Sequence, residues 1–142
     1  MSSIPSSEAG RALMHTASGT GGLLRLVLKL DAAVTGANAL AYLALAPLLS
    51  ELLGIPKEVQ LPAGVFLLAY ALAVLVTALR PAINRMAVSV FIAGNALWSI
   101  ASLAVVFAGA LPATTLGSVW IVLQAVVVAG FAVLQSIGLR RQ

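Results

Sequence analysis

The chain has 142 residues, of which 61% are hydrophobic and only 8% are charged, and its mean hydropathy is +1.09. Soluble domains carry about 25% charged residues, so this composition excludes a soluble enzyme, a disordered chain and a collagen-like fibre and favours a surface that faces lipid. The chain has no cysteine, which excludes disulfides, thiolate metal sites and cysteine nucleophiles.

Residues 1–22 differ in composition from the rest of the chain. Serine, glycine and threonine dominate them, and they contain no apolar segment of the kind found in a cleavable signal peptide. The sequence therefore predicts a flexible N-terminal tail. A short interfacial helix over residues 8–17 is the alternative.

Residues 23–142 contain the apolar segments. A helix needs about 20 mostly apolar residues to cross a bilayer core about 30 Å thick. The first two spans are predicted over 23–53 and 59–80. The stretch from 86 to 139 has no charged residue and is too long for one span. Proline, threonine and glycine divide it within residues 110–117, which predicts spans over 86–110 and 117–139. The fold class is therefore all-α, a membrane-embedded four-helix bundle.

The basic residues indicate how these spans are oriented. Seven of the eight lysines and arginines fall into three groups, namely Arg11, Arg25 and Lys29, then Arg80 and Arg85, then Arg140 and Arg141. Basic residues accumulate on the cytoplasmic side of membrane proteins. We therefore expect a multi-pass protein of the cell inner membrane with both termini in the cytoplasm, and with residues 51–60 and 110–117 outside.

Short internal matches point to a repeated helical hairpin. The triplet Asn38-Ala39-Leu40 in the first span recurs as Asn95-Ala96-Leu97 in the third. The pair Leu79-Arg80 likewise recurs as Leu139-Arg140. Duplication of a two-helix unit explains these matches, and chance similarity between Ala-Leu-rich helices is the alternative.

Polar residues inside the spans form stripes with helical spacing. Those on the first span are spaced four, three and four residues apart, which places them on one face. Polar side chains inside a membrane are costly unless they have partners, so they are expected to face the bundle interior. The candidate polar layer or ligand site consists of Asp31, Thr35, Asn38, Tyr42, Tyr70, Asn95, Trp98 and Gln124. Gln135 belongs to the stripe on the fourth span.

Counting from the nearest basic residue predicts how deep these side chains lie. Asn38, Tyr70 and Asn95 are each nine or ten residues from a lysine or arginine, about 14–15 Å along a helix, which predicts one layer in which they bond to each other. This layer is either a contact between helices or a polar binding site. Asp31 is nearer the basic residues, and we expect it to form an ion pair with Arg80, Arg85 or Arg140.

No motif for catalysis, phosphate binding or metal coordination occurs in the chain. The only histidine, His15, lies in the tail. We therefore expect a non-enzymatic protein with no catalytic residues, no cofactor and no metal site. The basic residues are not interleaved with exposed aromatic residues, so no nucleic acid is expected as a partner.

The segment from Lys29 to Tyr42, KLDAAVTGANALAY, with Asn95-Ala-Leu-Trp98 further on, resembles a group of small four-span bacterial integral membrane proteins. The resemblance covers residues 29–139. It implies the four-span architecture. The group has no assigned activity, so the resemblance implies no catalytic residues.

Two functions remain open from the sequence. The first is a structural or accessory module that associates with itself or with a larger membrane partner. The alternative is an oligomeric transporter or small-molecule-binding bundle that uses the mid-membrane polar layer. In both, membrane lipid surrounds the protein. A hydrated cavity at the polar layer would favour the second function, and a dry, mutually bonded layer would favour the first.

Overall fold

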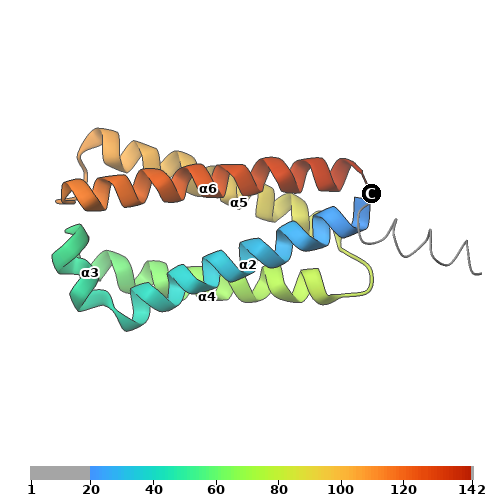
Figure 1. Ribbon diagram of the computed structural model, residues 1–142, viewed down its shortest axis with the longest axis horizontal. Helices are drawn as coiled ribbons and strands as arrows, with labels where there is room; N and C mark the ends of the chain where they lie inside the picture. Colours follow the sequence, from blue (N-terminus) through green and yellow to red (C-terminus); the bar gives the residue numbers. More distant parts are fainter. Residues whose placement is uncertain (1–19, 142) are drawn as a thin grey trace, which may run out of the picture.

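The computed structural model describes residues 20–141 and consists there of five helices (Figure 1). They are α2 (Thr20–Ala44), α3 (Ala46–Leu53), α4 (Lys57–Leu79), α5 (Arg85–Ala108) and α6 (Thr115–Arg140). Four of them, α2, α4, α5 and α6, are long and apolar enough to cross a membrane. The chain is therefore an all-α four-helix bundle of a multi-pass membrane protein, as the composition predicts.

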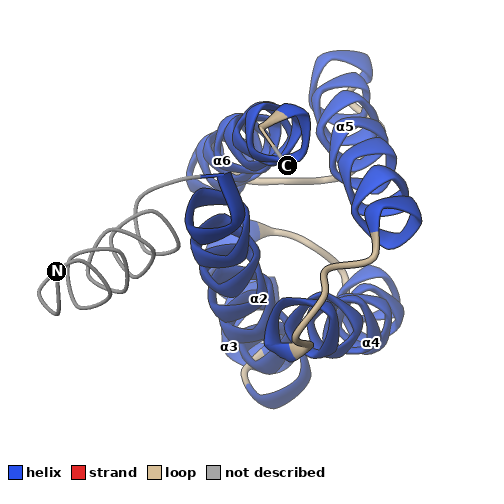
Figure 2. Cartoon of the chain, turned by 90° about the vertical axis from the view of Figure 1, so that its right-hand side faces the viewer, coloured by secondary structure: helices blue, strands red, loops and turns tan. Residues whose placement is uncertain are grey.

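The long helices form two hairpins. α2 packs along α4, and α5 packs along α6. The hairpins meet mainly where α2 lies against α6, while α4 and α5 touch over a much smaller region. In the end-on view of Figure 2 the four helices surround a central region. Two hairpins in this arrangement fit the interpretation of a duplicated helical hairpin.

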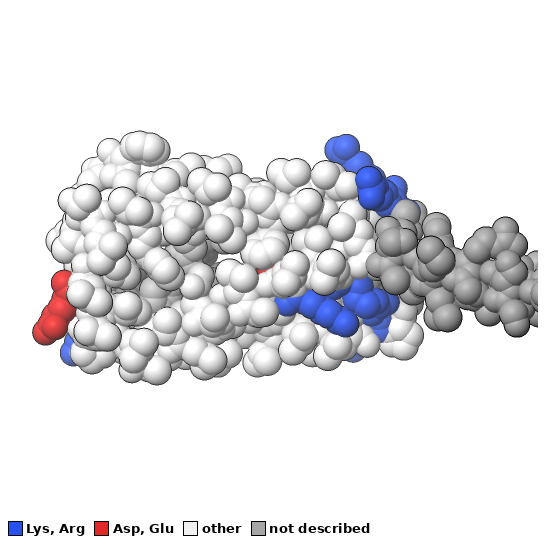
Figure 3. All heavy atoms as spheres, viewed as in Figure 1, with Lys and Arg blue, Asp and Glu red and all other residues white. Residues whose placement is uncertain are grey.

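The two ends of the bundle differ in charge. The start of α2, the turn between α4 and α5 and the end of α6 lie together (Figure 1). The described lysines and arginines gather there, except Lys57, which lies at the opposite end where α4 begins (Figure 3). We call the first of these ends the basic end. The opposite end, called the α3 end, holds α3, the turn between α5 and α6, and the exposed Glu51 and Glu58. Within the described residues, the three places where the basic residues group in the sequence, namely the start of α2, the turn between α4 and α5 and the end of α6, thus lie at one end.

The first predicted span is two helices. α2 begins at Thr20 instead of residue 23 and ends at Ala44, and α3 follows after Leu45. Pro47 has no backbone N–H and so cannot donate the hydrogen bond that would continue α2. It occupies the first turn of α3, where an N–H is not needed. The other predicted spans agree with α4, α5 and α6 to within about two residues at each end. The predicted tail falls almost wholly outside the described residues.

Polar side chains cap both helices of the second hairpin. The side-chain oxygen Oδ1 of Asn84 accepts hydrogen bonds from the backbone N–H groups of Met86 and Ala87 at the start of α5. Thr114 accepts one from the N–H of Gly117 at the start of α6 and donates its own hydroxyl to Leu52 O at 2.8 Å. Each cap satisfies backbone donors that a helix N-terminus leaves free. Thr114 also ties α6 to α3.

The α3 end depends on close backbone contacts at two glycines. Gly54 ends α3 with a φ of +70°, and a Cβ there would lie 2.5 Å from Pro112 O. A Cβ at Gly117 would lie 1.9 Å from Leu53 O. Only glycine permits such approaches. These two positions therefore hold the end of α3 against the start of α6.

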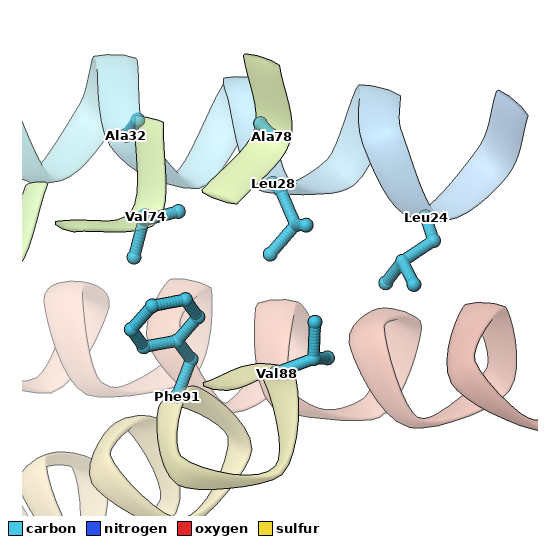
Figure 4. Close-up of a cluster of buried hydrophobic side chains, with 7 residues drawn as sticks. All are labelled: Leu24, Leu28, Ala32, Val74, Ala78, Val88 and Phe91. Atoms are coloured by element: carbon cyan, nitrogen blue, oxygen red, sulfur yellow. The ribbon is translucent and has the colours of Figure 1, made fainter. Parts of the chain in front are cut away.

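The basic end is closed by an apolar core (Figure 4). Its side chains come from α2, α4 and α5 and are buried. They are Leu24, Leu28, Ala32, Val74, Ala78, Val88 and Phe91. A Cβ at Gly138 of α6 would lie 3.0 Å from the Cα of Leu24, so α6 also packs tightly here. This cluster, called the basic-end core, separates the polar interior from the basic end.

Candidate functional site

The centre of the site is Asp31 of α2, whose side chain has no exposed surface (0%). Its Oδ1 accepts a hydrogen bond from the Thr35 hydroxyl at 2.8 Å, one turn further along α2. Its Oδ2 accepts one from Asn95 Nδ2 of α5 at 3.0 Å and one from Gln135 Nε2 of α6 at 2.7 Å. Three neutral donors on three helices therefore converge on one carboxyl group.

Tyr70 connects the fourth long helix to this group. Its hydroxyl lies 3.0 Å from Asn95 Oδ1 and 2.8 Å from the Phe91 carbonyl oxygen. Asn95 Nδ2 also lies 3.2 Å from Gln135 Oε1. The residues Asp31, Thr35, Tyr70, Asn95 and Gln135, called the Asp31 network, thus join α2, α4, α5 and α6.

The predicted ion pair of Asp31 with an arginine is wrong. Its hydrogen-bond partners are neutral, and the Arg85 guanidinium donates to Leu139 O at 2.9 Å instead. Arg25 donates to the carbonyl oxygens of Ala78, Arg80 and Pro81. These arginines satisfy carbonyls at or just beyond the ends of α4 and α6, a favourable position for cations. Asp31 lies too deep for them.

The predicted layer of Asn38, Tyr70 and Asn95 forms only in part. Tyr70 and Asn95 are bonded, whereas in the described part of the chain Asn38 is half-buried and makes no hydrogen bond to them. Asp31 takes its place, two turns closer to the basic end. Counting depth from Lys29 causes the error. Lys29 is exposed, and its long side chain can reach the interface from a deeper position, so Lys29 does not mark the end of the span.

A second polar cluster lies nearer the α3 end. Tyr42 Oη lies 3.3 Å from Gln124 Oε1 and accepts a hydrogen bond from Trp120 Nε1 at 3.1 Å. The polar residues on the one face of α2 therefore take part in two separate clusters along the bundle axis. Asp31 and Thr35 belong to the Asp31 network, and Tyr42 belongs to the cluster with α6.

A cavity of about 140 Å³, the central cavity, lies between these two polar clusters. All four long helices line it, with mostly apolar and aromatic side chains. Its polar lining consists of Thr35, Asn38, Tyr70, Asn95, Trp98, Trp120 and Gln124. The cavity is not fully enclosed, and its exposed lining residues include Val34 of α2 with Leu123 and Val127 of α6. Phe66 of α4 also lines the cavity and is exposed, so exposed lining residues lie on α2, α4 and α6.

Aromatic side chains fill the seam between α4 and α5. Phe66 of α4 stacks on Trp98 of α5, with ring centroids 5.9 Å apart and planes inclined by 10°. Tyr70 meets Phe91 edge to face at 5.5 Å. Trp98 Nε1 is buried and has no hydrogen-bond partner within the described residues. The few backbone contacts between α4 and α5 are thus supplemented by large rings.

A second cavity, the α3-end cavity, has a volume of about 190 Å³. Ile55, Val59 and Leu111 line it at the α3 end of the bundle. Trp98 and Gln124 line both cavities. The two cavities are therefore neighbours along the bundle axis, with these two side chains between them.

Two buried glutamines were not assigned to the site from the sequence. Gln135 has no exposed surface and bonds directly to Asp31. Its spacing from Gln124 places both on one face, and this shared face was the signal that could have assigned it. Gln60, also fully buried, donates to Ile55 O at 2.7 Å and to Ala46 O at 3.3 Å. It follows the loop after α3, and no periodic stripe marks it.

Comparison with protein-family models, with curated proteins and with solved structures finds no match for this chain.

Proposed function

We propose that this protein acts by binding a small, mostly apolar molecule in the central cavity, and that it is not an enzyme. The observation that carries the proposal is the cavity itself. It lies between two polar clusters, and all four long helices form its wall. Apolar cavities with a few convergent polar groups are the usual form of small-molecule sites. This is the binding function that the sequence left as the alternative to a structural or accessory module.

The volume of the cavity indicates the size of the ligand. An apolar cavity of about 150 Å³ accommodates benzene, and the central cavity measures about 140 Å³. A single-ring molecule therefore fits it, and a longer molecule would extend past Trp98 into the α3-end cavity. The amides of Asn38 and Gln124 line the wall and offer hydrogen bonds to one polar group on the ligand.

The exposed lining residues of the central cavity support entry from the membrane. Val34, Leu123 and Val127 line the cavity and are exposed on the lipid-facing surface. A ligand of this chemistry partitions into lipid before it binds. Transport across the bilayer would require a further conformation or an oligomer, because four helices leave no continuous pore. Because basic residues accumulate on the cytoplasmic side of membrane proteins, the basic end would lie at the cytoplasmic face of the inner membrane.

Tryptophan fluorescence tests this proposal directly. The chain has two tryptophans, and both Trp98 and Trp120 line the central cavity. We expect 4-bromophenol, a heavy-atom quencher of single-ring size, to quench the fluorescence of the detergent-solubilised protein in a saturable way. Unlabelled phenol should restore the signal by competition. Partitioning of the probe into the micelle alone would give a linear, unsaturable decrease.

A pair of substitutions on α6 provides the control. Val128 lines the central cavity and is buried, whereas Val133 is exposed. Val128→Phe should fill the cavity and abolish saturable quenching, while Val133→Phe should leave it unchanged. Thermal melting of both variants shows whether they remain folded. Linear quenching in the unsubstituted protein and in both variants would contradict the proposal. It would favour a structural or accessory module instead.

A further inference from the structure

Asp31 is an acidic side chain in the interior with no cationic partner among its bonds. Three neutral groups donate to its two oxygens. Taking a charge out of water costs several kcal/mol unless a counter-charge or hydrogen bonds compensate it. Ionisable residues inside a membrane usually mark ion or proton pathways. Asp31 therefore needs an explanation that the binding cavity alone does not supply.

The groups that face Asp31 limit which partner could neutralise its carboxylate. α5 presents Asn95 and α6 presents Gln135, neither of which titrates. α4 presents Tyr70, which reaches Asp31 only through Asn95. On α2 itself, Lys29 is exposed and Arg25 is bound to carbonyl oxygens of residues 78, 80 and 81. No described cation is placed to neutralise the carboxylate, so a proton from outside the bundle is the fitting partner.

Thr35 connects Asp31 to the central cavity. Its hydroxyl donates to Asp31 Oδ1 at 2.8 Å, and the same residue lines the cavity. A hydroxyl can accept one proton while it donates another, whereas the amides of Asn95 and Gln135 cannot pass a proton on in this way. About 10–15 Å³ is enough for one water, so the cavity has room for several. Water next to Thr35 would complete the connection.

Access of water and protons to Asp31 differs between the two ends of the bundle. The α3-end cavity and the central cavity follow one another along the bundle and share Trp98 and Gln124. On the other side the basic-end core closes the bundle, with Leu28 and Ala32 next to Asp31 in α2 (Figure 4). Polar groups and space therefore lead toward Asp31 from the α3 end, and packed apolar side chains block the basic end.

We propose that Asp31 is a proton-binding site that exchanges protons with the α3 end of the bundle through Thr35. A protonated water in the central cavity gives a proton to Thr35 Oγ1, which passes its own hydroxyl proton to Asp31 Oδ1. The carboxylate becomes a neutral carboxylic acid, Thr35 is regenerated and the donor remains as a neutral water. Release follows the same path in reverse. An organic ligand that fills the cavity would displace this water, so proton exchange belongs to the state in which the cavity holds water.

Isotope labelling gives a selective test, because Asp31 is the only aspartate of the chain. Protein labelled with [4-¹³C]aspartate in lipid nanodiscs should show one carboxyl resonance by NMR. We expect this resonance to shift reversibly between two positions as the pH is changed. A resonance that stays in one position throughout the pH range in which the protein remains folded would overturn the proposal.

The role of Thr35 is tested by the rate of protonation. After a pH jump, infrared spectroscopy of the labelled carboxyl should report slower uptake in Thr35→Val, by about 10²-fold, the lower end of the range for positioned proton-transfer groups. Thr35→Ser retains the hydroxyl and should restore the rate. A purely structural Thr35 would leave the rate of folded Thr35→Val unchanged, and that result would overturn the relay.

The direction of access is tested with single cysteines, which have no background in this cysteine-free chain. Asn38→Cys places a thiol on the central cavity. Ala78→Cys places one in the basic-end core, only two residues from Arg80. We expect a water-soluble thiol reagent to modify the deeper position 38 and to fail at position 78. Modification of position 78 with none at position 38 would overturn access from the α3 end.

Discussion

At the scale of single residues, the position of Asp31 is explained by the number and direction of its donors. Asn95 and Gln135 donate to one oxygen and Thr35 donates to the other. Hydrogen bonds to a charged group contribute about 1.5–3 kcal/mol each, more than bonds between neutral groups. A carboxylate can therefore stay inside the bundle without an arginine beside it. The arginines satisfy helix carbonyls at the basic end instead.

Substitution of Asn95 tests whether hydrogen bonds to the Asp31 carboxylate contribute more than hydrogen bonds between neutral groups. Asn95→Leu keeps a similar volume and removes a donor to Asp31, and we expect it to lower the free energy of unfolding by about 1.5–3 kcal/mol. Ser99, one turn away on α5, donates to Ala125 O at 2.8 Å and involves no charge. Ser99→Ala should cost only about 0.6 kcal/mol, as for neutral bonds between membrane helices. Unfolding in mixed micelles measures both, and equal losses would show that Asp31 is not stabilised as a charge.

At the scale of helices, the contact between α3 and α6 depends on a backbone approach. Leu53 O lies where a Cβ on Gly117 would be, and Thr114 N donates to the same oxygen at 2.9 Å. α3 is short, so its position is fixed largely by these contacts. The α3-end cavity takes Ile55 and Leu111 from the two loops that meet here. Moving α3 would therefore change the shape of that cavity.

Two glycines of α6 offer a matched test of this contact. Gly117→Ala should destabilise the protein by about 1–3 kcal/mol, because its Cβ would overlap Leu53 O and force the helices apart. Gly130→Ala meets nothing within 4 Å. It should be neutral or stabilising by up to about 1 kcal/mol, because alanine favours helix. Thermal melting compares the two variants, and equal melting temperatures would contradict the packing described at the α3 end.

The helices could be predicted from the sequence because apolar runs and their breaks are local signals. Asn84 and Thr114, which cap α5 and α6, stand next to apolar runs and so belong to these local signals. Pro47, which follows the break at Leu45, is a local signal of the same kind. The position of Asp31 along the bundle axis relative to the other helices could not be predicted, because it depends on how far each helix is shifted along its neighbours. Asn95 therefore pairs with Asp31 and not with Asn38, a choice that counting residues from Lys29 cannot make.

At the scale of the whole molecule, charge and cavities divide the bundle along its axis. The basic end has an apolar core and surface arginines, and the α3 end has two glutamates and the larger cavity. The central cavity and the Asp31 network lie between them. Binding from the membrane and proton exchange with the α3 end both follow from this arrangement.

Membrane orientation is tested with two exposed positions at opposite ends. In intact cells, Lys57→Cys at the α3 end should react with a membrane-impermeant maleimide. Arg80→Cys at the basic end should react only after permeabilisation, because basic residues are retained in the cytoplasm. Immunoblotting of the labelled protein gives the readout. Equal labelling of both positions in intact cells would contradict the predicted orientation.

Neutral amides from α5 and α6 hold Asp31 in the interior of the bundle. Solid-state NMR in lipid bilayers tests this arrangement through contacts between the ¹³C-labelled Asp31 carboxyl carbon and ¹⁵N-labelled side chains. We expect cross-peaks to two amide nitrogens, one lost in Asn95→Leu and the other in Gln135→Leu. A cross-peak to an arginine guanidinium nitrogen, with none to these amides, would contradict it.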